Sequence, residues 1–272
     1  MGLAPRALSG TLMTRPYQDE APRLSVIIPA YNEADRIGPY LAAIAKYLHQ
    51  RRIPYEILVV DDGSQDRTGS VVAQVSADAA GIRLLRLERN LGKGGAVRMG
   101  VRTARGECLL VADADGATPI PELERLEAAI EKGADIAIGS RFLASRDHQY
   151  TVRARWHRSV LGNLFNWIVQ RLGISGITDT QCGFKLFRGP VAQDLFSVSR
   201  INGYGFDLET LYVAQRRGYR ITEVPINWAD QPGTKVRVFQ DGLRMLGEML
   251  TVRRHYRHGA YGSRAQPLTP AP

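Results

Sequence analysis

The chain has 272 residues, of which 44% are hydrophobic and 23% are charged, as in an ordinary globular protein. This composition excludes a disordered or fibrous chain, and the length provides ample core for one large domain or two small ones. The net charge of +9 and the pI of 9.8 suit an anionic partner, such as nucleic acid, an anionic membrane surface or a phosphate-bearing ligand.

The cysteines and the N-terminal sequence indicate in which cellular compartment the protein resides. The two cysteines, Cys108 and Cys182, fit a reducing cytosol better than a disulfide scaffold. Residues 1–22 lack periodicity and the apolar stretch of a signal peptide, so we expect a loose tail. No run of the sequence approaches the ~18 apolar residues of a membrane span. We therefore expect a cytoplasmic protein, either soluble or peripheral on the cytoplasmic face of a membrane.

The first half of the chain alternates strands with helices. Continuous apolar runs predict five strands, at 24–31, 55–64, 82–88, 107–115 and 134–141. Amphipathic segments between them predict helices at 35–50, 66–79, 94–106 and 121–133. Apolar strands separated by helices indicate βαβ units, and hence an α/β fold with a mostly parallel central sheet and flanking helices.

The second half has a different pattern. It predicts an apolar-faced helix at 158–173, a strand entered from a loop at 178–189, a helix at 206–218 and a strand at 221–228. A basic, amphipathic helical stretch follows at 234–258, and then a disordered tail at 259–272. We expect a single domain over 23–258, in which 143–258 forms a smaller subregion beside 23–142.

Polar motifs follow each of the five strands of the first half. In chain order they read "PAYNE", "DDGS", "RNLGKGG", "DADG" and "GSR". Ligands of parallel sheets bind beyond the carboxyl ends of the strands, so these motifs should meet at one edge of the sheet. The sequence therefore predicts one site built from all five motifs.

Asp113 and Asp115 stand one residue apart where the fourth strand ends. In an extended chain both side chains project to the same side, and two carboxylates so close repel unless a cation or a proton lies between them. A hard divalent cation takes one or two carboxylates together with substrate phosphates and water. A solvated turn is an equally good interpretation of this segment alone, because Asp and Gly are common turn formers.

Two further motifs suit a phosphate-bearing ligand. Asp61 and Asp62 follow the second strand, where one could accept hydrogen bonds from a base or a ribose, although a helix-capping turn would also use them. The segment 92–96, "GKGGA", could hold phosphate through backbone N–H groups and Lys93. Neither a P-loop nor a dinucleotide-binding glycine pattern is present in the sequence.

Seven motifs together carry a family resemblance. "SVIIPAYNE", "VVDDGSQDRT", "NLGKGGAVRMG", "DADGAT", "IGSRF", "DTQCGFKLF" and "GTK" follow one another over about 210 residues. In this order they resemble the inverting family 2 glycosyltransferases of the GT-A fold, and most closely the dolichyl-phosphate β-glucosyltransferases. The resemblance implies metal-dependent transfer of glucose from UDP-glucose to a polyprenyl phosphate, with 23–142 binding the nucleotide sugar and 143–258 the acceptor.

The resemblance also implies roles on the donor side. Asp62 would face the uracil, and Asp113 and Asp115 would hold Mg²⁺ or Mn²⁺, with Asp115 also counted among the catalytic residues. The full set expected to bind the nucleotide sugar is Pro29, Tyr31, Glu33, Asp61, Asp62, Lys93, Asp113, Ala114 and Asp115.

On the acceptor side, Asp179 falls where relatives carry a carboxylate that can act as a base. Asp179 is therefore counted among the catalytic residues. A phosphate acceptor has a second pKa of about 6 and is mostly dianionic at pH 7, so we expect Asp179 to position groups and to act as a base only for a hydroxyl acceptor. Arg141, Arg158 and Lys235 match positions assigned to phosphates, and Arg141 is also expected to take part in catalysis. Arginine suits this because its planar guanidinium bonds phosphate oxygens in pairs.

Three alternatives remain at this point. "DADGATPI" replaces the "DADLQHPP" usual in polyprenyl-phosphate mannosyltransferases, which favours UDP-glucose over GDP-mannose. A family member with a soluble acceptor is a further alternative, and a non-catalytic basic binding protein is a remote one. Nucleic acid is not expected as a partner, because no reading module is present in the sequence. The basic C-terminal stretch either lies on an anionic leaflet or packs on the core with a basic outer face.

Overall fold

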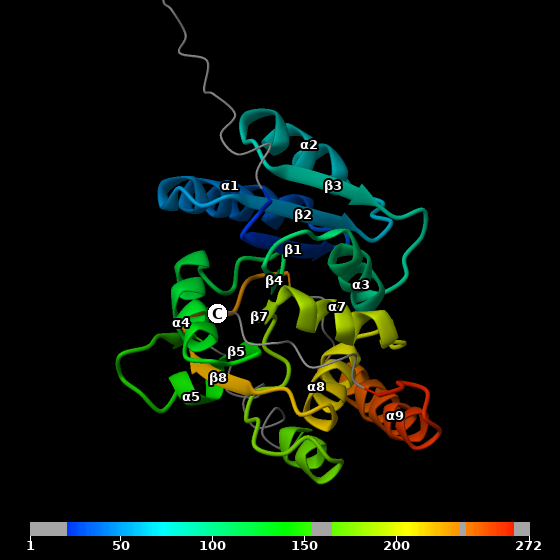
Figure 1. Cartoon of the computed structure of the whole chain (residues 1–272). Coiled ribbons are helices and arrows are strands. Elements are labelled where there is room, and N and C mark those ends of the chain that lie inside the picture. The colour runs from blue at the N-terminus through cyan, green and yellow to red at the C-terminus, as the bar shows by residue number, and fades with distance from the viewer. Residues whose placement is uncertain (1–20, 154–164, 234–237, 264–272) are drawn as a thin grey trace, which may run out of the picture.

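The centre of the fold is a seven-stranded sheet (Figure 1). The computed structural model describes residues 21–153, 165–233 and 238–263. Within these ranges the strand order is β3-β2-β1-β4-β7-β5-β8, and all neighbours are parallel except that β7 runs antiparallel to β4 and β5. The strands are β1 Leu24–Ala30, β2 Tyr55–Asp61, β3 Ile82–Arg86, β4 Cys108–Ala112, β5 Ile136–Ser140, β7 Phe184–Arg188 and β8 Ile221–Pro225.

Helices cover both faces of this sheet. One face packs against α1 Ala34–Arg51, α2 Thr68–Asp78 and α4 Leu123–Glu131. The other packs against α3 Lys93–Thr103, α7 Gly189–Val198, α8 Phe206–Arg216 and α9 Val238–Arg257, and the last three lie together in Figure 1. Shorter elements are η1 Ile120–Glu122, α5 Arg141–Ala144, the helical residues 165–171, and a small parallel pair of β6 Val152–Arg153 and β9 Trp228–Ala229.

The strand residues show why continuous apolar runs predicted this sheet. Val26, Ile27 and Ile28 of β1 are all 0% exposed. Because strand side chains alternate between faces, Ile27 belongs to one hydrophobic cluster while Val26 and Ile28 belong to the other. A strand covered by helices on both faces needs apolar residues at every position. The α/β fold with a mostly parallel sheet is confirmed, and the five predicted strands are present in slightly shorter form.

Strand β7 was predicted as a strand, but its place in the sheet was not. It comes from the second half of the chain and lies between β4 and β5, with Leu186 opposite Leu110 on one side and Ala137 on the other. The loop before β7 therefore runs beside the end of β4, where the Gly183 carbonyl accepts a hydrogen bond from the Asp113 N–H at 3.1 Å. This pairing brings the "DTQCGF" motif to the acid pair.

Several predicted features fall on residues outside the described ranges. These are most of both predicted tails, the beginning of the helix expected at 158–173, and two candidate phosphate-binding residues, Arg158 and Lys235. Among the described residues, no helix combines the length and apolarity needed to cross a membrane.

Candidate active site

A cavity of about 590 Å³ opens at the carboxyl ends of β1, β2 and β4. Its walls come from the loops after these strands, the beginning of α3, the segment 202–204 before α8, and one arginine of α9. The lining residues are Pro29, Ala30, Tyr31, Glu33, Arg36, Asp62, Asn90, Leu91, Gly92, Lys93, Ala96, Asp113, Ala114, Asp115, Asn202, Gly203, Tyr204 and Arg244. Four of the five motifs predicted to form one site thus line one cavity, whereas the fifth, "GSR", contributes no lining residue.

Hydrogen bonds hold the first two loops against each other. Asn32 has a φ of 52°, and its N–H donates to Ser64 Oγ at 2.9 Å. The next N–H, from Glu33, donates to Thr68 Oγ1 at 2.7 Å. Arg36 then donates from Nε and a terminal nitrogen to the two Glu33 carboxylate oxygens, at 2.7 and 2.6 Å. The "PAYNE" and "DDGS" loops therefore form one fixed rim of the cavity.

The two acids after β2 have different environments. Asp61 is 0% exposed, accepts a hydrogen bond from the Ser64 N–H at 2.8 Å and lies 3.6 Å from Arg86 Nε. Asp62 lines the cavity and accepts from the N–H groups of Leu91 and Gly92, at 2.7 and 2.8 Å. Burial raises the pKa of Asp62 above its usual range, although the two backbone donors oppose this. Asp61 shapes the turn, whereas Asp62 fixes the loop that leads into Lys93.

Lys93 is the first residue of α3 and points at the acid pair. Its Nζ lies 2.6 Å from Asp113 Oδ1 and 5.8 Å from the centre of the Phe206 ring. Burial alone would lower the pKa of Lys93, but Asp113 and Asp207 hold it above its usual range, so the ammonium stays charged. Gly92 precedes this lysine and has a φ of 94°, which favours glycine, and a side chain at this position would overlap the Asn202 carbonyl. Glycine at this position therefore allows the loop to bring Lys93 into the cavity.

A buried ion pair lies behind Lys93. Lys185 and Asp207, whose side chains are 3% and 6% exposed, form a salt bridge, and Lys185 Nζ also donates to the Cys182 carbonyl at 2.6 Å. Burial raises the pKa of Asp207, whereas Lys185 and Lys93 lower it. The charges of Asp113, Lys93, Asp207 and Lys185 therefore alternate from the cavity into the interior. A lysine inside the apolar run of β7 was the sequence signal for this network, and it was missed.

The acid pair suits a divalent cation. Asp113 and Asp115 both line the cavity, with side chains 38% and 24% exposed. Burial and then the neighbouring Asp113 raise the pKa of Asp115, and the Ala117 N–H, Arg36 at 3.7 Å and Lys93 offset this only in part. A cation between the carboxylates would relieve this repulsion. No cluster of three or more His, Cys, Asp or Glu forms among the described residues, so a diphosphate and water would complete the coordination of Mg²⁺ or Mn²⁺.

Arg141 and Asp179 form a tight pair at the end of β5. Nε and a terminal nitrogen of Arg141 donate to the two carboxylate oxygens of Asp179, each at 2.7 Å, and the Arg141 N–H adds a third bond at 2.9 Å. Trp228 covers the guanidinium, whose central carbon is 5.3 Å from the ring centre. Glu223 accepts a hydrogen bond from the Asp179 N–H at 2.9 Å and so fixes the loop that carries Asp179.

These contacts determine what Asp179 can do. Burial by itself would raise the pKa of Asp179, but the Arg141 guanidinium and its hydrogen bonds hold that pKa below the usual range. Both carboxylate oxygens already accept hydrogen bonds, so the group is a poor proton acceptor. Neither residue is among those that line the cavity, although the charge of Asp113 helps to raise the pKa of Arg141. The geometry agrees with a positioning role for Asp179.

Most of the residues expected to bind the nucleotide sugar come together, and only Asp61 of that set does not line the cavity. Their individual roles stay predictions. Sequence reasoning missed the lining residues that come from the second half of the chain, namely Asn202, Gly203, Tyr204 and Arg244. These residues lie about 90 or more positions after the acid pair, and no motif marks them. The glycines of "NGYG" were a weak signal, because side chains at Gly203 and Gly205 would overlap Glu248 of α9.

Comparison with known proteins identifies close sequence relatives. The family model described as glycosyl transferase family 2 matches residues 25–196. Over 252 residues the chain is 39% identical to dolichyl-phosphate beta-glucosyltransferase from Mus musculus. The aligned region covers 88% of this chain and 77% of the relative.

Solved structures show the same fold at low sequence identity. Glucosyl-3-phosphoglycerate synthase from Mycobacterium tuberculosis in complex with UDP matches with a TM-score of 0.65 and 18% identity, over 85% of this chain and 80% of that one. The same enzyme with Mn²⁺, UDP-glucose and phosphoglyceric acid matches with a TM-score of 0.62 and 17% identity, over 85% and 79%. The likeness confirms the expected GT-A fold.

Proposed function

Because the chain belongs to glycosyl transferase family 2, we propose that it moves glucose from UDP-glucose to a polyprenyl phosphate of the dolichyl type. The products would be a β-glucosyl phospholipid and UDP. The observation that carries this proposal is the acid pair beside Lys93 in a cavity lined by the family motifs. The 39% identity to a dolichyl-phosphate beta-glucosyltransferase over most of both chains supports the choice of sugar and acceptor.

The donor would lie along the edge of the sheet. Pro29, Tyr31 and Glu33 would line the nucleotide end of the cavity, and Asp62 would face the uracil while its carboxylate still fixes the 91–92 loop. Lys93 would hold the diphosphate, since its charge is maintained by the buried acids around it. Asp61, outside the cavity, would act on the donor only through the turn that it stabilises.

Asp113 and Asp115 would hold Mg²⁺ or Mn²⁺, with the Ala114 backbone between them. When bound, the cation would neutralise charge that develops on the departing UDP. The chain's own part is to keep the two carboxylates aimed into the cavity. The Gly183 carbonyl fixes the Asp113 backbone at 3.1 Å, and the Ala117 N–H donates to Asp115 Oδ1 at 3.0 Å.

The transfer itself needs no general base. An oxygen of the acceptor phosphate would attack the anomeric carbon on the side opposite UDP, so that the new carbon–oxygen bond forms as the bond to UDP breaks. The bonding electron pair leaves with UDP, and the configuration inverts. A phosphate monoester is mostly dianionic at pH 7, with a second pKa of about 6, and has no proton to give up at the attacking oxygen. This agrees with an Asp179 whose oxygens are already engaged.

The acceptor phosphate would be bound by arginine and lysine. Arg141 stands at the end of β5 with its side chain 32% exposed, and Asp179 and Trp228 fix its plane. Arg158 and Lys235 are proposed for the same phosphate from their motifs. We place the protein at the cytoplasmic face of a membrane, because the acceptor is a lipid and both cysteines are free thiols.

A transfer assay tests the proposal. Radiolabelled UDP-glucose and GDP-mannose are compared as donors to a short-chain polyprenyl phosphate, with Mg²⁺ and with EDTA. EDTA-sensitive labelling from UDP-glucose alone is the expected result. Labelling from GDP-mannose alone would show that the transferred sugar is mannose and not glucose. If UDP-glucose binds but the lipid is not labelled, the acceptor is not a lipid phosphate, and a soluble acceptor takes its place.

A further inference from the structure

Most of the large exposed hydrophobic side chains of the described residues lie on two helices. Four are exposed among the described residues, namely Met99 at 38%, Trp167 at 56%, and Leu243 and Leu250 at 57% each. Trp167 lies in the helical residues 165–171, and both leucines lie in α9. Three of the four therefore belong to two helices of the second half of the chain.

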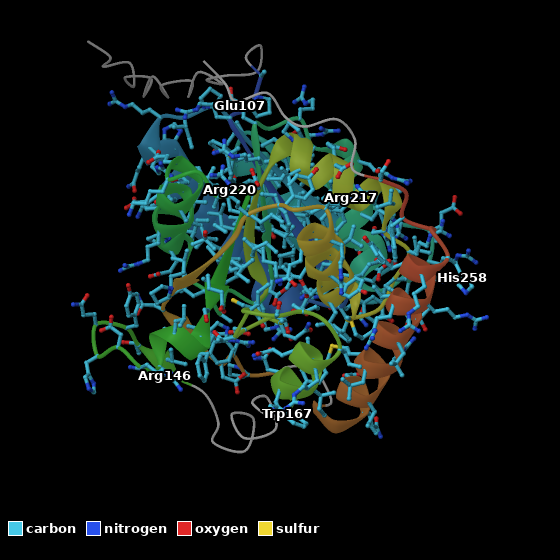
Figure 2. All side chains as sticks on the ribbon, turned by 60° about the horizontal axis from the view of Figure 1, so that its bottom comes forward. Glu107, Arg146, Trp167, Arg217, Arg220 and His258 are labelled. Atoms are coloured by element: carbon cyan, nitrogen blue, oxygen red, sulfur yellow. The ribbon has the colours of Figure 1, made fainter. Side chains whose placement is uncertain are left out.

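These two helices are neighbours. A side-chain carbon at Gly242 of α9 would lie 4.0 Å from the Phe165 ring, two residues before Trp167. Figure 1 and Figure 2 both show the helix of Trp167 beside the beginning of α9, and Trp167 projects outward at the bottom of Figure 2. Leu243 and Leu250 are seven residues apart, so they share one side of α9 with the exposed Gly247 between them. Leu243 and Leu250 therefore form an apolar strip along α9, and Trp167 adds a third exposed side chain on the neighbouring helix.

The buried side of α9 accounts for the rest of its apolar residues. Met245, Met249 and Val252 are 8% or less exposed and belong to the hydrophobic core. Packing on the core, one of the two expectations for this stretch, is therefore confirmed. It does not explain Leu243 and Leu250, which point away from the core.

The exposed charges of α9 are positive. From residue 240 to 257 of α9 the exposed positions include Arg244, Arg254 and Arg257 but no carboxylate. The two acids of this stretch, Asp241 and Glu248, are only partly exposed, and Glu248 accepts from the Gly205 N–H at 2.8 Å. Exposed apolar side chains on the same helix as exposed arginines match an anionic bilayer, where leucine and tryptophan enter the interface and arginine meets lipid phosphates.

The strip is continuous with the cavity. Arg244 is the neighbour of Leu243, its side chain is 74% exposed, and it also lines the cavity. A surface bound to membrane through this side of α9 would present the mouth of the cavity to the lipid headgroups. A lipid-linked phosphate could then reach the site without leaving the bilayer.

We propose that Trp167, Leu243 and Leu250, with Arg244, Arg254 and Arg257, form a docking face for an anionic lipid bilayer. The face gives the proposed lipid acceptor its route to the site, and in that respect it rests on the proposed function. A second copy of the chain fits the face less well, because a twofold contact would set arginines against arginines. Nucleic acid needs arginine for its phosphates but no exposed leucine strip.

Vesicle sedimentation tests the face directly. The full chain should bind vesicles that contain a third phosphatidylglycerol and should bind neutral phosphatidylcholine vesicles far more weakly, with the difference shrinking as salt rises. The double variant Leu243→Ser with Leu250→Ser should bind anionic vesicles about tenfold or more weakly, because both side chains leave water on binding. Arg254→Gln with Arg257→Gln should lower binding about tenfold as well.

Matched substitutions elsewhere serve as controls. Met99→Ser removes an exposed apolar side chain of α3, and Arg220→Gln removes an arginine that is 69% exposed and lies 3.8 Å from Asp135. Both should leave vesicle binding unchanged. If they weaken it as much as the α9 variants do, or if the α9 variants bind like the wild type, the docking face is refuted. Dissociation of a dimer by the α9 variants, without vesicle binding by the wild type, would assign the face to a second copy instead.

Transfer assays separate this inference from the proposed function. The leucine variant should keep wild-type transfer to a short-chain acceptor dissolved in water and lose about tenfold with an acceptor embedded in vesicles. If the leucine variant loses vesicle binding but the wild type transfers glucose to neither acceptor, the docking face is upheld and the lipid acceptor is rejected. Equal transfer by wild type and variant to the embedded acceptor would reject the face.

Discussion

Gly183 lies against the carboxylate of Asp113, and a single methyl group there should disable the proposed metal site. A side chain at Gly183 would overlap Asp113 Oδ2, and its three nearest atoms all belong to the Asp113 carboxyl group. Gly183→Ala therefore turns the Asp113 carboxylate away. Misplacing a group that orients a metal ligand commonly costs 10–100-fold in metal affinity or activity, and we expect a loss of about that size.

The same geometry predicts a small effect on stability. Turning Asp113 breaks its 2.6 Å ion pair with Lys93, and the Asp113 side chain is 38% exposed. A partly exposed pair of this kind contributes about 0.2–1 kcal/mol after solvent screening. For a domain of this size that corresponds to a fall in Tm of at most about 4 °C.

The assay measures transfer as a function of Mn²⁺ concentration, alongside thermal unfolding. Gly183→Ala should need about 10–100 times more Mn²⁺ for half-maximal rate and should unfold close to the wild type. Gly247→Ala is the matched control, because a side chain there meets no atom within 4 Å. A Gly183→Ala protein with wild-type rate and wild-type Mn²⁺ dependence would show that Asp113 does not hold the metal.

Two further predictions concern the same cavity, and a third concerns the ion pair of Arg141 and Asp179. Asp115→Ala should abolish transfer. The circular dichroism spectrum should stay that of the wild type, because the Asp115 side chain lies on the cavity wall and not in the core. Turnover at the wild-type rate would refute the assignment of Asp115 as a metal ligand. Lys93→Met should weaken UDP binding about tenfold or more in calorimetry, because the ammonium is replaced by an uncharged side chain of similar length; unchanged affinity would place the diphosphate elsewhere. Asp179 has a lowered pKa in the folded chain, so it adds stability above the unfolded pKa of about 3.9, and this is lost as pH falls through the folded value. The free energy of unfolding of the wild type should therefore exceed that of Asp179→Asn at pH 7, and the gap should narrow below about pH 4; a constant gap would contradict the ion pair with Arg141.

The local pattern of apolar and polar residues was sufficient to predict much of the fold. Each apolar run of the first half became a strand because a strand buried on both faces tolerates little else, as at Val26, Ile27 and Ile28. The order of motifs was sufficient to predict the family and the part of the cavity lining that follows β1, β2 and β4. Parallel strands bring their carboxyl ends to one edge whatever lies between them, so Glu33, Asp62 and Asp113 had to be close.

Long-range contacts decided the rest. The sequence predicted a strand at β7 but contained no sign that it would enter between β4 and β5, because strand pairing depends on the whole sheet. That insertion places Gly183 against Asp113, and α8 and α9 then bring Tyr204 and Arg244 to the far wall of the cavity. Sequence periodicity also could not tell which side of α9 is buried. Packing of Met245 and Met249 on the core leaves Leu243 and Leu250 exposed, since a helix can turn only one side toward the protein.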